Sequence, residues 1–131
     1  MNRENPDYDN SPTLRTIPMP SDTNANGDIF GGWMLSQMDL AGSIIAVKTA
    51  KTRVATVGIE AMSFHKPVFV GDEVSFYCSI DRIGRTSITV YIESWARNRL
   101  SAKSQKVTEG KFTYVAIDEN RKPVAVERQD G

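Results

Sequence analysis

Residues 27–42 read GDIFGGWMLSQMDLAG and carry the strongest structural signal in this chain. Glycine, alanine, methionine and leucine dominate and no proline intervenes, so the pattern predicts a helix over residues 31–48. Asp39 stands near the middle of this mostly apolar helix. A fully buried, unpaired carboxylate would cost several kcal/mol or take up a proton. We therefore expect Asp39 to be exposed, partnered or lining a cleft.

Helical periodicity places Asp39 on a face of small residues. Residues three, four and seven positions apart share a helix face. The face of Asp39 then holds Gly32, Leu35, Ser36, Gly42, Ser43 and Ala46. The opposite face, which we expect to be the core face, holds Met34, Met38, Ala41, Ile44 and Ile45. The small residues would let a backbone or a thin ligand approach closely, or else they form a plain packing seam with Asp39 at its rim.

The start of the predicted helix is a second candidate element. Gly31 and Gly32 put backbone N–H groups at the positive end of the helix dipole, where they could bind an anion or a developing oxyanion. The alternative is that the glycines only make the turn, with Asp28 as the N-terminal cap. Neither G-x-G-x-x-G nor a P-loop is present.

The rest of the chain predicts a single α+β domain. With 131 residues the chain is large enough for one core. We expect tails at residues 1–12 and 127–131 and the domain at 13–126. A short edge strand (14–19) and a turn-rich loop (21–28) precede the helix, and antiparallel strands follow it at 54–62, 73–83, 87–96 and 106–117. One helix covers only one sheet face, so we expect a homo-oligomer.

Composition argues against several classes of function. The formal net charge is zero, which leaves no basic excess for nucleic acid. No apolar run approaches the ~18 residues of a membrane span, and the polar N-terminus shows no secretory signal. Cys78 is the lone cysteine and cannot form an intrachain disulfide. We therefore expect a cytoplasmic protein with no membrane or nucleic-acid partner.

Two chemically active side chains are expected to have structural roles. His65 is the only histidine, which excludes a metal site built on histidines and argues against a Ser-His-Asp triad. No metal is therefore expected, and His65 is assigned a structural or surface role. Cys78 lies in a strand pattern and is expected to fill the core rather than act as a nucleophile.

Three segments together resemble a known family. DTNANGDIFGGWMLSQMDLAG (22–42), RVATVGIEAMSFHKPVFVGDEV (53–74) and IGRTSITVYIESW (83–95) are similar to the hotdog-fold acyl-CoA thioesterases of the bacterial YciA type. The resemblance covers about residues 14–124 and implies one long central helix wrapped by a five- to six-stranded antiparallel sheet. It also implies dimers joined edge to edge, the dimer as the minimal active unit, and assembly into homohexamers.

The resemblance further implies roles for individual residues. Asp39 matches the catalytic aspartate, acting as general base or nucleophile in the hydrolysis of acyl-CoA to a free acid and coenzyme A, without a cofactor. The backbone amides of Gly31 or Gly32 match the place where the thioester carbonyl is polarised. Asn24 or Asp28 matches the polar residue that positions water or the carbonyl from the partner subunit.

Other roles stay open at this stage. Ser43, one turn after Asp39, could reach its carboxylate or the attacking water. The candidates for contacting coenzyme A, each with a plain surface role as the alternative, are Lys66, Arg85, Thr86, Ser87, Arg97 and Lys103. Eight residues of helix span roughly 12 Å, so one thioester would take Gly31 from one subunit and Asp39 from its neighbour. The alternative function is a non-catalytic acyl-CoA-binding sensor on the same fold. A link to fatty acid metabolism is the expected setting.

Overall fold

The computed structural model of the protein describes residues 11–101 and 103–126. The expected tails lie outside these ranges, apart from residues 11 and 12. The described chain contains one long helix, five strands and a short 3-10 turn, η1, at Pro20–Asp22. The bounds are β1 (Leu14–Thr16), α1 (Gly31–Ala50), β2 (Arg53–Phe64), β3 (Glu73–Ile83), β4 (Ser87–Arg97) and β5 (Ser104–Ile117).

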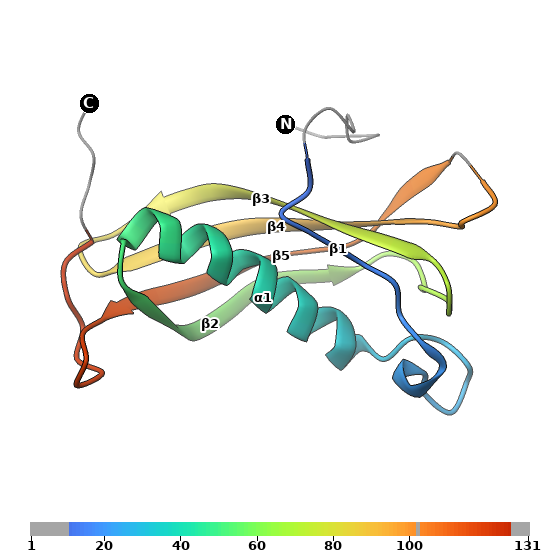
Figure 1. Ribbon diagram of the computed structural model, residues 1–131, viewed down its shortest axis with the longest axis horizontal. Coiled ribbons are helices and arrows are strands. Elements are labelled where there is room, and N and C mark those ends of the chain that lie inside the picture. Colours follow the sequence, from blue (N-terminus) through green and yellow to red (C-terminus); the bar gives the residue numbers. More distant parts are fainter. Residues whose placement is uncertain (1–10, 102, 127–131) are drawn as a thin grey trace.

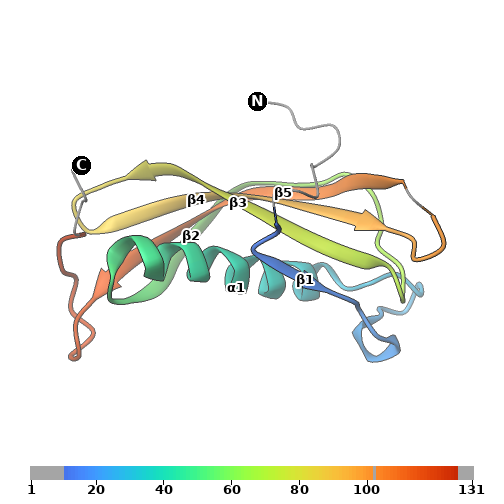
Figure 2. The ribbon, with the colours of Figure 1, turned by 45° about the horizontal axis from the view of Figure 1, so that its top comes forward.

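The five strands form one antiparallel sheet in the order β1-β3-β4-β5-β2. Figure 1 shows α1 lying along this sheet, and the turned view in Figure 2 places the helix against one face. The predicted α+β layout is confirmed, with each element within a few residues of its expected place. The start of α1 and the β4–β5 hairpin lie at one end of the molecule, whereas the end of α1 and the β3–β4 turn lie at the other (Figure 1).

The core lies between α1 and the sheet. The residues that α1 buries are Met34, Met38, Ala41, Gly42, Ala46 and Ala50. They pack against buried sheet residues that include Phe76, Val90, Ile92, Phe112 and Tyr114. Full burial of one such large apolar side chain contributes about 1.5–3 kcal/mol to folding. The contact between α1 and the sheet therefore supplies much of the hydrophobic stabilisation.

The core face of α1 is rotated relative to the prediction. Gly42 and Ala46 are buried, whereas Ile44, which was expected in the core, is 38% exposed. A Cβ built on Gly42 would collide with the Tyr114 hydroxyl on β5 and with the Ile92 side chain on β4, so a larger residue does not fit between helix and sheet at this position. Packing therefore explains Gly42, which favours the packing-seam interpretation of the small residues, with the partly exposed Asp39 at its rim.

Asp28, which one of the two interpretations of the helix start made the N-cap, does not cap α1. The N-cap is Phe30 and no side chain caps the helix. The chain stays extended through Phe30, because Ile29 N–H donates to the Val68 carbonyl (3.0 Å) and Phe30 N–H donates to the Asp22 carbonyl (2.9 Å). Asp28 is therefore too early to cap the helix.

Several large apolar side chains remain exposed on α1 and β2. β2 stands at the edge of the sheet and pairs only with β5. Its Val57 is 60% exposed, and Leu40 on α1 is 56% exposed. The other exposed apolar residues of these elements are Ile44, Val47, Ile59 and Phe64. In residues 11–101 and 103–126, no helix combines the length and apolar character needed to span a membrane.

Candidate active site

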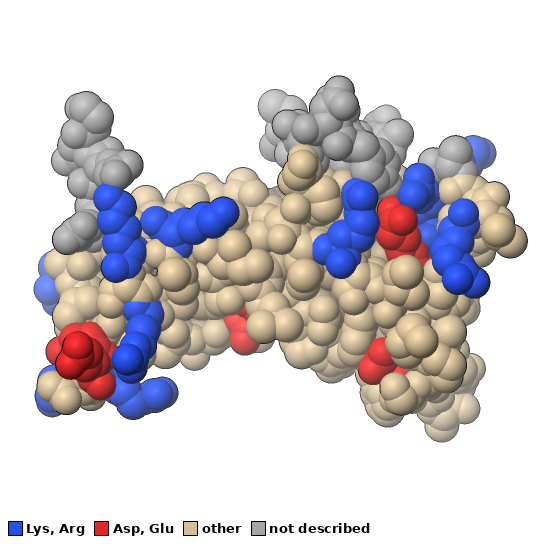
Figure 3. Space-filling view, in the orientation of Figure 1, with Lys and Arg blue, Asp and Glu red and all other residues tan. Residues whose placement is uncertain are grey.

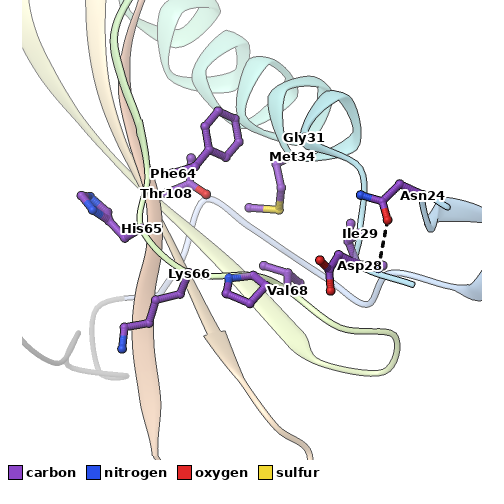
Figure 4. A pocket seen from close by; sticks show the side chains of 11 residues that line it. Asn24, Asp28, Ile29, Gly31, Met34, Phe64, His65, Lys66, Val68 and Thr108 are labelled. Carbon is purple, nitrogen blue, oxygen red and sulfur yellow. Dashed lines mark hydrogen bonds between the residues drawn. The ribbon is translucent and has the colours of Figure 1, made fainter. Parts of the chain in front are cut away.

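A pocket of ≈ 320 Å³ opens at the start of α1. Figure 4 shows the side chains that converge on it from the loop before the helix, the helix itself and the end of β2. Its lining comprises Asn24, Asp28, Ile29, Gly31, Met34, Phe64, His65, Lys66, Pro67, Val68 and Thr108. The structure thus brings Asn24, Asp28, Gly31 and Lys66 together in one place.

The loop before α1 is shaped by Asn24. Its side-chain oxygen accepts hydrogen bonds from the N–H groups of Asn26 (2.9 Å) and Asp28 (3.1 Å), as expected of an Asx turn. Asn24 N–H donates to the Asp28 carbonyl at 2.7 Å, and Gly27 takes the positive φ of 85° that closes the loop. The amide nitrogen of Asn24 remains directed toward the pocket (Figure 4). Asn24 therefore organises the loop and still presents a donor.

The backbone of Gly31 and Gly32 is open to an incoming group. The first N–H groups of a helix have no acceptor inside it, and these two have none among the described residues. A Cβ on Gly32 would meet nothing within 4 Å, and one on Gly31 would make only ordinary contact with the Phe64 ring at 3.6 Å. Packing within this protomer does not explain either glycine. Two donors are thus available at the positive end of the helix dipole.

Asp39 lies on the third turn of α1, away from this pocket. Its Oδ1 accepts a hydrogen bond from the Thr56 hydroxyl on β2 at 2.7 Å. The Tyr114 hydroxyl donates to the Asp39 backbone carbonyl at 2.9 Å. Burial, followed by the negative charge of Asp39, raises the pKa of Tyr114, so this hydroxyl stays a donor. Asp39 is partly exposed and partnered, which was one of the arrangements expected.

A wider cavity of ≈ 600 Å³ lies beside Thr56. It is lined by Ser43, Val47, Arg53, Val54, Ala55, Thr56, Ile117 and Arg121. Ser43 faces this cavity, but its hydroxyl donates to the Leu40 carbonyl at 2.7 Å rather than to Asp39. The hydroxyl that reaches the Asp39 carboxylate is therefore that of Thr56.

The candidate contacts for coenzyme A do not gather in one protomer. Lys66 borders the pocket at the helix start. Arg97 is engaged by Glu73, with Nη2 3.0 and 3.1 Å from its two oxygens. Lys103 borders a separate cavity of ≈ 390 Å³ with Phe69 and Asp72. The β3–β4 turn, which contains Arg85, Thr86 and Ser87, lies at the other end of the molecule (Figure 1).

Lysine and arginine side chains are also separated into two groups on the face that carries α1 (Figure 3). Figure 3 shows lysine and arginine side chains gathered at the two ends of this face, with few charges between them. Within the described residues, no group of three or more histidine, cysteine, aspartate or glutamate side chains could hold a metal ion.

Cys78 and His65 are the two side chains that were expected to have structural roles. Burial raises the pKa of the Cys78 thiol to about 11, partly offset by a hydrogen bond from Thr13, so the thiol stays protonated at neutral pH. This agrees with a core filler rather than a nucleophile. His65 Nε2 lies 2.6 Å from Glu109 Oε2.

Sequence reasoning missed Thr56 and Thr108. Thr56 lies seventeen residues after Asp39, in another element. Only the pairing of β2 with β5 beside α1 brings the two side chains together. A polar residue in a β-branched strand is too common to mark a site. Thr108 enters the pocket from β5 and carries no local signal of its own.

Comparison with known proteins gives concordant matches. The family model of the thioesterase superfamily matches residues 26–103. The acyl-CoA thioester hydrolase YciA of Salmonella typhimurium is 49% identical over 122 residues, which cover 88% of this chain and 92% of that protein.

Solved structures agree with this relationship. The aspartate-to-alanine mutant of a hexameric broad-specificity acyl-coenzyme A thioesterase has a TM-score of 0.86 and 45% identity, covering 91% of this chain and 88% of that one. A hexameric hotdog-fold thioesterase of Campylobacter jejuni has a TM-score of 0.84 and 40% identity, covering 88% of this chain and 90% of that one. The sheet and helix described above are thus those of the hotdog fold.

Proposed function

The chain belongs to the thioesterase superfamily, and from that premise we propose that it hydrolyses acyl-CoA thioesters to a free acid and coenzyme A. The observation that carries the proposal is the Asp39 carboxylate. It is partly exposed on α1 and fixed through one oxygen by Thr56. Within the described chain its second oxygen is left to face a reactant.

In the proposed reaction, an oxygen nucleophile attacks the carbonyl carbon of the thioester. The nucleophile is a water deprotonated by Asp39 or the Asp39 carboxylate itself. The carbonyl oxygen takes up the negative charge and accepts hydrogen bonds from Gly31 or Gly32 N–H, a kind of contact typically worth about 10²–10³ in rate. Asn24 or Asp28 borders the same place and would orient the water or the carbonyl.

Collapse of the tetrahedral intermediate breaks the carbon–sulfur bond. The leaving group is a thiolate, the base of a thiol with a pKa near ~8.5, so no strong general acid is required. The proposed reaction accordingly needs no cofactor. If Asp39 attacks directly, the resulting anhydride is cleaved by water in a second step.

The active site in this proposal is shared between protomers. Eight helical residues, roughly 12 Å, separate Gly31 from Asp39 in one chain, which is too far for both to touch one thioester. The exposed apolar residues of β2 and α1 suit burial against a second copy. We propose a dimer as the minimal active unit and a homohexamer as the assembly, as the structural neighbours are hexameric.

The decisive experiment is a thiol-release assay across acyl-CoA chain lengths, comparing the wild type with Asp39→Asn. Asp39→Asn keeps the shape of the side chain but removes the base, so turnover is expected to fall by about 10²-fold or more while the oligomer stays intact. Unchanged turnover would show that Asp39 is not the catalytic residue. A wild type that binds acyl-CoA but releases no thiol would instead identify a sensor.

A further inference from the structure

A cluster of charged groups occupies the sheet face turned away from α1. Side chains alternate between faces along a strand, and Ile92 and Phe112 point into the core, so their neighbours on β4 and β5 point outward. We call this group the outer-face cluster. It consists of His65, Tyr91, Glu93, Lys106 and Glu109.

The cluster holds two carboxylates in register. Glu93 and Glu109 are direct cross-strand partners, an arrangement that is destabilising for like charges. The Tyr91 hydroxyl lies 2.9 Å from Glu109 Oε1 and 3.1 Å from Glu93 Oε2. It carries a single proton and can donate to only one of them at a time. Glu93 is only 5% exposed, so solvent does little to screen the repulsion.

A lysine and a histidine contact one of these carboxylates. Lys106 Nζ lies 3.3 Å and His65 Nε2 lies 2.6 Å from the same atom, Glu109 Oε2. With His65 protonated, two positive and two negative charges balance. With His65 neutral, one negative charge is left over. Burial alone would raise the pKa of Glu109, but hydrogen bonds from His65, Tyr91 and Lys106 outweigh burial and lower it.

His65 also belongs to the pocket at the helix start. Residues 65–68 follow the end of β2 and form one wall of that pocket. The wall is tied to β5 by His65 N–H, which donates to the Val107 carbonyl at 2.8 Å, and to the pre-helix loop by Ile29 N–H on the Val68 carbonyl. Figure 4 shows the His65 ring directed away from Met34, so it contacts Glu109 from behind the pocket.

We propose that His65 is a positioning residue whose ion pair with Glu109 holds the pocket wall against β5, and that the pair holds the wall more tightly when His65 is protonated. The inference rests on the proposed function in taking acyl-CoA as the ligand of the pocket. Protonation turns a hydrogen bond into a charge-assisted one and balances the outer-face cluster. Affinity for acyl-CoA is therefore expected to fall as the pH rises and His65 loses its proton.

The other groups facing His65 do not supply this pH dependence. They are Lys106 and Glu109 on β5, Tyr91 and Glu93 on β4, and Lys66 beside it. The Lys111–Asp81 ion pair, at 3.5 Å, lies further along the same face. Carboxylates, lysines and tyrosines ordinarily titrate outside the interval from pH 5 to 8.

The test combines steady-state kinetics with NMR. Because the chain has one histidine, its ring resonance reports His65 without ambiguity. The KM for acyl-CoA is expected to rise by up to about fivefold between pH 5.5 and 8, with its midpoint at the NMR midpoint of His65. His65→Gln keeps a donor but cannot titrate, so its KM should stay constant. His65→Ala should raise KM at low pH and leave kcat within about twofold.

Lys106→Gln is the matched control. It removes the other cation from the same glutamate oxygen, but Lys106 and Glu109 both lie on β5, so the wall is not released. Its KM should still rise with pH, with a midpoint that follows the NMR midpoint of His65 measured in that variant. A His65→Gln protein whose KM still varies with pH, or a His65→Ala protein with wild-type KM, would overturn the inference.

A further readout does not depend on catalysis. Glu109→Gln removes the negative charge beside the ring, so the NMR midpoint of His65 should move to lower pH. An unmoved midpoint would overturn the ion pair, whatever the enzyme does. If the wild type releases no thiol from any acyl-CoA, the proposed function fails, and the His65–Glu109 pair is still judged by this shift.

Discussion

Asp39 is fixed by two neighbours that come from different strands. Thr56 on β2 donates to its carboxylate, and Tyr114 on β5 donates to its backbone carbonyl. A catalytic group gains most when its orientation is set before the substrate arrives. Thr56 is the side chain that performs this role within the described protomer, because the Ser43 hydroxyl is committed to the Leu40 carbonyl.

Thr56→Val is therefore expected to lower kcat by about tenfold, the equivalent of one hydrogen bond to a charged group. Valine keeps the β-branched shape and the strand preference, so the fold and KM should change little. Thr56→Ser retains the hydroxyl and should recover most of the lost rate. The measurement is thiol release under saturating acyl-CoA. Equal rates for the valine and serine variants would contradict a role for the hydroxyl.

The helix α1 combines two different uses of glycine. Gly42 is required by the sheet, since a Cβ there would collide with the Tyr114 hydroxyl. Gly32 meets nothing within 4 Å. We expect Gly42→Ala to lower the free energy of unfolding by about 1–3 kcal/mol through overpacking. Gly32→Ala should leave it unchanged or raise it by up to ~1 kcal/mol.

Urea unfolding at equal protomer concentration measures both changes, since the stability of an oligomer depends on concentration. Tyr114→Phe removes the atom that lies nearest to the new Cβ, so adding it to Gly42→Ala should restore part of the loss. Two alanine variants of equal stability would show that Tyr114 does not pack against Gly42.

Local pattern explains which elements could be predicted. The β-branched alternation located β2 to β5, and the proline-free run located α1, because each signal is contained in its own segment. The local pattern could not predict which face of α1 is turned toward the core. Tyr114, which packs against Gly42 and donates to the Asp39 carbonyl, lies 75 residues away from Asp39 in the sequence. Whether Asp28 caps α1 could not be decided locally for a related reason, since the contacts of Phe30 with Asp22 and of Ile29 with Val68 keep this segment extended.

The residues of the candidate site also fall into two groups, those that local sequence could indicate and those that only the fold brings together. Asn24, Asp28, Gly31 and Lys66 are close in sequence to the pocket-forming loops, and the structure gathers them. The contacts Thr56–Asp39 and His65–Glu109 join residues 17 and 44 positions apart. They exist only once β2 and β5 are paired, so no spacing in the chain could have indicated them.

At the scale of the whole molecule, α1 carries halves of two different proposed active sites, the Gly31 N–H group and the Asp39 carboxylate. Substituting each half in a separate protein tests whether the active site is shared between protomers. Asp39→Asn removes the carboxylate. Gly31→Pro removes one N–H at the first helical position, where proline is well tolerated, and Phe30 before it already has the extended φ and ψ of −55° and 137° that proline requires. Each variant alone should be nearly inactive, provided that Gly31 N–H supplies the main donor.

Mixing the two variants after dissociation should restore thiol release. In a mixed dimer, one site joins an intact Gly31 to an intact Asp39, and the other site carries both substitutions. Random pairing makes half of the dimers mixed, so the activity should approach about a quarter of the wild-type value. If both groups served the same site from one chain, every site in the mixture would lack one of them and activity would stay at the level of the single variants. Wild type mixed with Asp39→Asn in the same way should give about half of the wild-type activity, with or without subunit exchange, and so controls for activity lost during dissociation and reassembly.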